Sequence, residues 1–279
     1  MSKIIGIILL VGAVFLISVA LKNAPGNPLS ATPNETSVSN VNVNNPFPGN
    51  GTTISNPATA ATPIAKRVNI SSVNFSSYPQ EYSKISLSTN LKTGEIIDIT
   101  GWKIKSNRNE IEIPKAVELY DPSGFSANGD IILKQGNYVD LYSSAGSFNK
   151  NIRLNKCFGY LEGIYNFQPA YVPSNCPVFS PSDARQLSGQ CQNYVLSLSS
   201  CRLPDTVFYN SLPGNDQGNA CRSFLNNIGY GSCFRSHQND ADFLSSNWIV
   251  WLNSQIFDSQ HDYVRLYDGQ GNLMAEYTY

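Results

Sequence analysis

Residues 96–105 read IIDITGWKIK, and apolar and polar residues alternate over most of this stretch. A period of two predicts a strand with one buried face. The same pattern recurs in short runs at residues 82–88, 111–113, 117–120, 129–133 and 138–142. Turn sequences separate the runs: KTG at 92–94, DPSG at 121–124, NG at 128–129 and QGN at 135–137. Short strands punctuated in this way predict a β-sandwich or a barrel.

A second β-block is predicted at the C-terminus. YVRLY at 263–267 and LMAEY at 273–277 flank the glycine-containing sequence DGQGN, which is typical of a hairpin loop. WIVWL at 248–252 is rich in aromatic and β-branched residues, and it predicts a further strand that packs into the core.

Residues 149–245 lie between the two β-blocks and differ from both. SPSD at 180–183 resembles a helix start, and apolar residues follow at helical spacing up to residue 198. Residues 221–228 predict a second short helix that ends at Gly229. The sequence therefore predicts a mainly helical insertion in a β-domain that spans residues 67–279.

All six cysteines fall within this insertion. They are Cys157, Cys176, Cys191, Cys201, Cys221 and Cys233. An even set in one loop-rich segment of an exported chain predicts three disulfides. We expect neighbours in sequence to pair, giving Cys157–Cys176, Cys191–Cys201 and Cys221–Cys233. The alternatives are free thiols or zinc, although no C-x2-C pair is present and Cys233-x3-His237 is the only suggestive spacing.

The N-terminus predicts export. Residues 4–21 carry no charge, and as a helix they would measure roughly 27 Å, enough to span a bilayer. We expect residues 1–22 to form a transmembrane signal anchor. A signal peptide cleaved after the small residues at 18–20 is the alternative. Either interpretation places the remaining chain outside the cytoplasm.

Residues 23–66 predict a linker. The stretch is rich in Asn, Pro, Ser and Thr, and its only charged residues are Glu35 and Lys66. Such a composition offers too little apolar surface for a core, so we expect a disordered tether between the membrane and the β-domain.

The sequence contains no recognisable catalytic motif. His237 and His261 are the only histidines. Asp240 and Asp242 near His237 could bind a cation, but a helix cap is the simpler interpretation, and the Ser-His-Asp set within 258–262 lies in a polar stretch. We therefore expect a non-catalytic protein without metal or cofactor. A net charge of −1 and a pI near 6.1 give no reason to expect a nucleic-acid partner.

Four segments together resemble the lamin-tail domain family. They are ISLS at 85–88, IDITGWKIK at 97–105, DIILKQGNYV at 130–139 and VRLYDGQGNL at 264–273. The resemblance covers residues of about 68–148 and 247–279. It implies an immunoglobulin-like β-sandwich that acts as an interaction or structural module, and it supplies no catalytic residues. The cysteine-containing insertion departs from the family pattern.

These observations predict a membrane-tethered extracytoplasmic module that binds a protein or cell-wall partner, or a purely structural surface component. One alternative is an accessory module of a DNA-uptake or nuclease system, and another is a secreted hydrolase with an unrecognised site. The DNA alternative requires a basic stripe, and its candidate residues are Lys103, Lys105, Arg108, Lys115, Lys150, Arg153 and Lys156.

Overall fold

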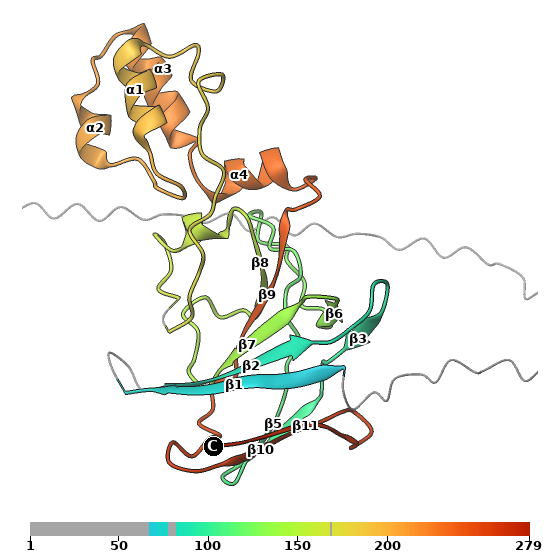
Figure 1. The fold of residues 1–279 in the computed structure, drawn as a ribbon. Coiled ribbons are helices and arrows are strands. Elements are labelled where there is room, and N and C mark those ends of the chain that lie inside the picture. The colour runs from blue at the N-terminus through green and yellow to red at the C-terminus, as the bar shows by residue number, and fades with distance from the viewer. Residues whose placement is uncertain (1–66, 78–81, 168) are drawn as a thin grey trace, which may run out of the picture. The chain divides into compact units, whose positions relative to one another are not determined.

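A computed structural model describes residues 67–77, 82–167 and 169–279. The predicted transmembrane segment and linker lie outside the described residues. Within them the protein is mainly β, with a group of helices between its eighth and ninth strands (Figure 1). No helix in this part of the chain is long and apolar enough to cross a membrane.

The strands of the described residues form three sheets. The five-stranded sheet has the order β1 (Val68–Ser76), β2 (Tyr82–Thr89), β7 (Tyr138–Tyr142), β9 (Leu244–Trp251) and β8 (Ile152–Asn155). The four-stranded sheet has the order β11 (Leu273–Thr278), β10 (Tyr263–Tyr267), β4 (Lys103–Lys105) and β5 (Glu110–Glu112). A two-stranded sheet pairs β3 (Ile96–Asp98) with β6 (Ile132–Lys134).

The five-stranded and four-stranded sheets share one hydrophobic core. Leu87, Leu141 and Trp248 enter it from the larger sheet, and Ile104 and Leu266 enter it from the smaller one. Pairing within these sheets is antiparallel except between β7 and β9, which run parallel. That exception follows from the insertion, because the chain leaves the sheet after β8 and returns as β9 between β7 and β8.

The stretch 96–105 does not form one strand. It divides into β3 and β4, which belong to different sheets. The break is local: the Asp98 carboxylate accepts a hydrogen bond from the Thr100 amide at 2.8 Å, and Gly101 has a φ of 74°. A positive φ is favourable for glycine and unfavourable for a residue with a Cβ, so the chain can turn here.

The predicted strand at 117–120 is wrong. Val117 makes only an isolated parallel bridge to Ile152, and Ala116 makes one to Gly129. The segment instead lies against the insertion, where the centre of the Tyr120 ring lies 5.5 Å from that of Tyr230.

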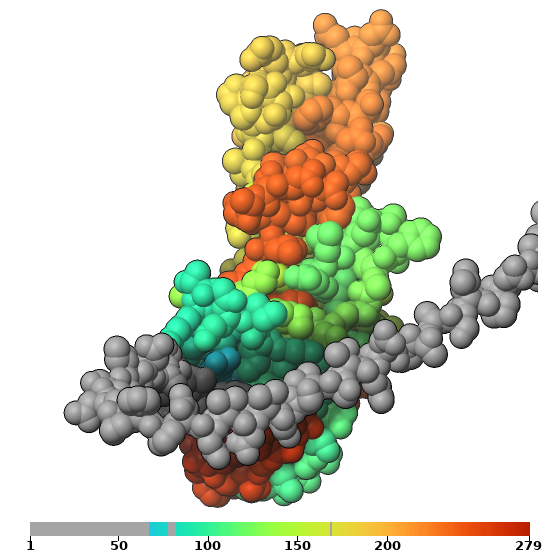
Figure 2. All heavy atoms as spheres, turned by 90° about the vertical axis from the view of Figure 1, so that its right-hand side faces the viewer, coloured from blue at the N-terminus to red at the C-terminus, as the bar shows by residue number. Residues whose placement is uncertain are grey.

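Four α-helices and one 3-10 helix lie within the predicted insertion. They are η2 (Phe158–Leu161), α1 (Gly189–Ser197), α2 (Thr206–Ser211), α3 (Asp216–Asn226) and α4 (Tyr230–His237). The SPSD sequence does not start the first helix as predicted. The Asp183 carboxylate accepts hydrogen bonds from the Ser180 amide and hydroxyl, which closes a separate turn, and α1 begins only at Gly189. In the space-filling view the insertion, in yellow and orange, lies at one end of the described chain (Figure 2).

A second hydrophobic core lies under the insertion. Its members include Ile152 and Leu154 of β8, Ile249 and Trp251 of β9, and helix residues such as Val195. Strand β9 therefore supplies both cores in alternation, because Trp248 and Val250 belong to the core between the sheets.

We expect substitution of Asp262 to lower the stability of the fold substantially. Its side chain is fully buried, and it accepts hydrogen bonds from the backbone amides of Asn107, Asp258 and Tyr263. Removing the carboxylate leaves buried donors unpaired, so we expect Asp262→Ala to lower the free energy of unfolding by about 2–3 kcal/mol. The measurement is urea unfolding of the full chain followed by tryptophan fluorescence.

The matched control is Asp130→Ala. Asp130 is an exposed carboxylate 3.2 Å from Lys115, and such surface pairs contribute little. Equal stability losses in the two variants would contradict the structural role assigned to Asp262.

Candidate functional site

Three disulfides hold the insertion together. Cys157, which follows β8, pairs with Cys233 of α4. Cys176 pairs with Cys201, and Cys191 of α1 pairs with Cys221 of α3. The Cα–Cα distances are 5.8, 5.0 and 6.0 Å, within the range of ordinary disulfides. The six cysteines therefore form disulfides as predicted.

The expected pairing of sequence neighbours is wrong. None of the pairs Cys157–Cys176, Cys191–Cys201 and Cys221–Cys233 forms. Helices α1 and α3 bring residues 191 and 221 together across 30 residues of chain, and α4 returns to the end of β8 across 76 residues. Tertiary packing, rather than the length of the intervening loop, decides which thiols meet.

The hydroxyl of Tyr230 fixes α4 to the sheet beside the first disulfide. It accepts a hydrogen bond from the Asn155 side-chain amide at 2.9 Å and donates one to the Tyr120 carbonyl at 2.6 Å. Burial is the main cause that raises the pKa of Tyr230 above its ordinary value. The Asn155 carboxamide oxygen in turn accepts from the Cys157 amide at 3.0 Å. This network positions α4, and with it one wall of a pocket.

The pocket has a volume of about 520 Å³ and lies entirely within the insertion. Its walls come from η2, from the loop at 177–183, from the end of α3 and from α4. The lining residues are Tyr160, Pro177, Val178, Phe179, Asp183, Phe224, Asn227, Ile228, Gly229, Ser232, Cys233, Ser236 and His237. Volumes of this size are typical of small-molecule sites.

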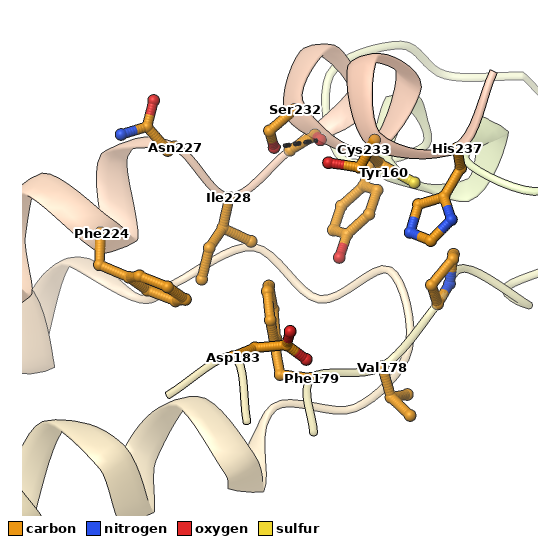
Figure 3. A pocket seen from close by; sticks show the side chains of 13 residues that line it. Tyr160, Val178, Phe179, Asp183, Phe224, Asn227, Ile228, Ser232, Cys233 and His237 are labelled. Carbon is orange, nitrogen blue, oxygen red and sulfur yellow. Dashed lines mark hydrogen bonds between the residues drawn. The ribbon is translucent and has the colours of Figure 1, made fainter. Parts of the chain in front are cut away.

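Aromatic and aliphatic side chains make the body of the pocket. Figure 3 shows Tyr160, Phe179 and Ile228 around the hollow, with His237 at one end and Phe224 at the other. The rings of Phe179 and Phe224 pack edge to face, 5.7 Å apart. Val178 is 65% exposed at the rim.

Tyr160 is the most unusual polar group of the pocket. Its side chain belongs to a residue only 4% exposed, its hydroxyl points into the hollow, and that hydroxyl has no hydrogen-bond partner among the described residues (Figure 3). Burial raises the pKa of Tyr160 above its ordinary value. The hydroxyl is not among the buried polar atoms without a partner, so it is accessible in the hollow, where a water or a ligand atom can complete its hydrogen bonds.

His237 and Asp183 supply the remaining directed polar atoms. His237 Nδ1 lies 2.8 Å from Asp240 Oδ2. In the neutral tautomer that donates this hydrogen bond, Nε2 is left as an acceptor. Hydrogen bonds from the Ser180 hydroxyl and amide lower the pKa of Asp183. Asp183 is therefore an anion at neutral pH.

The candidate residues named from sequence occupy other roles. Asp240 and Asp242 both accept hydrogen bonds from Lys156, at 3.0 and 2.5 Å. These bonds, that of Asp242 first, raise the pKa of Lys156. His261 Nδ1 lies 2.7 Å from the Tyr279 carbonyl oxygen rather than against a carboxylate. Among residues 67–77, 82–167 and 169–279, no group of three His, Cys, Asp or Glu side chains could hold a metal ion.

Sequence analysis missed the pocket and its main residues. Tyr160, Phe179 and Phe224 come from three separate segments, and each resembles an ordinary core aromatic in sequence. Their convergence depends on the disulfide pairing, which was also predicted wrongly. Of the lining residues, Cys233 and His237 were named for their spacing as possible zinc ligands and Asp183 as part of a helix start, none of them for a cavity.

Comparison with models of known protein families finds no match, and comparison with curated proteins finds none either. The resemblance to the lamin-tail domain therefore stays a prediction, carried by the segments quoted above.

The three disulfides should differ in how much each stabilises the fold. In the chain-entropy model a bridge that closes a longer loop stabilises more: the separation of 76 residues for Cys157–Cys233 corresponds to about 4.5 kcal/mol, and that of 25 for Cys176–Cys201 to about 3.5 kcal/mol. We expect the double serine variant at 157 and 233 to be the less stable of the two in urea unfolding.

The variant at 176 and 201 is the matched control, because it removes the same chemistry from the same insertion. A larger loss of stability in that control would contradict the ranking.

Proposed function

We propose that the protein is a tethered extracytoplasmic binding module, and that the disulfide-linked insertion is its contact surface. The observation that carries the proposal is the pocket, which is built wholly from the insertion and has the Tyr160 hydroxyl pointing into it without a partner among the described residues. Ligand sites commonly combine an apolar cavity with a few convergent polar groups. The partner we favour is a protein or cell-wall component of the envelope.

The three disulfides support a location outside the cytoplasm, because they suggest an oxidising extracellular environment. We further propose that residues 1–22 anchor the protein in the membrane or direct its secretion. On this proposal residues 23–66 hold the folded part away from the membrane.

The β-domain serves as the scaffold in this proposal. We infer an immunoglobulin-like sandwich of the lamin-tail type from the quoted sequence segments and from the core that the two larger sheets share. In such a scaffold, binding residues lie on connections held by rigid strands. The insertion is a connection of this kind, since it leaves the sheet at β8 and rejoins it at β9.

The charge distribution weighs against the nucleic-acid alternative. Of the seven basic residues that could form a stripe, all but Lys150 lie 3.8 Å or less from a carboxylate. Arg153, for example, lies 2.9 Å from Glu118. Paired cations attract phosphate less strongly because the nearby carboxylates repel it.

The proposal predicts that a charge at the pocket rim weakens binding to the envelope. Val178 is 65% exposed and lines the pocket, so Val178→Lys should fold normally and oppose an apolar or cationic contact. We expect at least a tenfold loss in the affinity of the full oxidised chain for the envelope fraction of its own cell, measured by co-sedimentation over a concentration series.

The matched control is Ile96→Lys. Ile96 is 61% exposed on β3, away from the insertion, and its substitution should leave the affinity unchanged. If the two variants bind equally well, or if the unaltered chain does not bind the envelope, the proposed function is overturned.

A further inference from the structure

We propose that the pocket binds a cation carried on an apolar stem, of the kind that a lysine or arginine side chain of a protein partner presents. This inference rests on the proposed function and specifies the chemistry of the same site. It follows from the charge of the lining, from the direction of its polar atoms and from its aromatic walls.

Charge is the first step. Asp183 is the only formally charged residue in the lining, and no Lys or Arg reaches it. The lowered pKa of Asp183 keeps the carboxylate ionised near neutral pH. An anionic ligand would meet repulsion without a compensating cation. A cationic ligand would gain the attraction that the pocket offers.

The acceptor atoms are the second step. Asp183 Oδ2 already accepts from Ser180, but Oδ1 has no partner among the described residues. His237 offers Nε2 once Nδ1 is engaged by Asp240. These free atoms accept hydrogen bonds, and an ammonium or guanidinium group has only donors.

The aromatic walls are the third step. Tyr160, Phe179 and Phe224 surround the hollow (Figure 3), and aromatic faces attract cations while also covering an apolar stem. The unpaired Tyr160 hydroxyl can accept a hydrogen bond from the cation at the base of the pocket. A stem of four or more methylene groups fits a cavity of about 520 Å³.

The direct test uses three probes with one stem: hexylammonium, hexanol and hexanoate. Binding to the full oxidised chain is measured by saturation-transfer NMR at low ionic strength. We expect hexylammonium to bind at least tenfold more tightly than hexanol, and hexanoate to bind most weakly. Equal binding of the ammonium and the alcohol, preference for the carboxylate, or no binding at all would each overturn the inference.

Two substitutions in the lining test whether hexylammonium binds in the pocket. Asp183→Asn keeps an acceptor for Ser180 and removes the charge, so it should weaken hexylammonium about tenfold and leave hexanol unchanged. Tyr160→Phe should weaken hexylammonium by a smaller factor, about threefold. The control is Asp130→Asn, which removes an exposed charge on the β-domain and should have no effect. Loss of hexylammonium binding in this control to the same extent as in Asp183→Asn would overturn the assignment to the pocket.

A peptide pair identifies the source of the cation. Ac-Gly-Lys-Gly-NH2 and its norleucine counterpart differ only in the ammonium group. Preference for the lysine peptide supports a protein partner. If hexylammonium binds but the lysine peptide is not preferred over the norleucine peptide, the inference of a protein partner is overturned. Failure of the envelope assay while hexylammonium still binds would overturn the proposed function alone, so the two failures can be told apart.

Discussion

The pleat of strand β9 is the constraint on which the rest of the structure depends. Side chains alternate across a strand, and both faces of β9 are buried. Trp248 and Val250 point into the core between the sheets, while Ile249 and Trp251 point into the core beneath the insertion. A shift of one residue in register would exchange these two sets of side chains. The pairing of β9 with β7 on one side and β8 on the other therefore fixes the β-domain and the insertion at once.

Arg153 of β8 makes contacts that depend on the register between β8 and β9. It lies opposite Trp248 in the pairing of β8 with β9, and its guanidinium lies 5.7 Å from the centre of the Trp248 ring. The same group reaches Glu118 and the Ser245 carbonyl. A buried cation is tolerated only with such partners, so the long side chain can cover the tryptophan without an unpaired charge.

The strands were predictable because their pattern is local. The site was not predictable, since it depends on contacts between residues distant in sequence. Residues 82–88 and 263–267 alternate regularly between clear turns, and both form strands. The stretch 96–105 alternates equally well, but a turn at Gly101 sends its two halves to different sheets. Cysteine positions predicted disulfides correctly, yet not their pairing, because six thiols allow fifteen connectivities and sequence distance does not select among them. The pocket follows from that pairing and was missed with it.

The covalent links also help to hold the walls of the pocket in place. Cys233 lines the pocket and is bonded to Cys157, which lies two residues after the end of β8. Tyr230 fixes the first turn of the same helix to Asn155, the last residue of β8. The wall that carries His237 is therefore held by a covalent bond and by a buried hydrogen bond to one strand end. Walls fixed before binding need little ordering when a ligand arrives, and less of the interaction free energy is lost. The insertion thus gains preformed pocket walls from the same links that stabilise its fold.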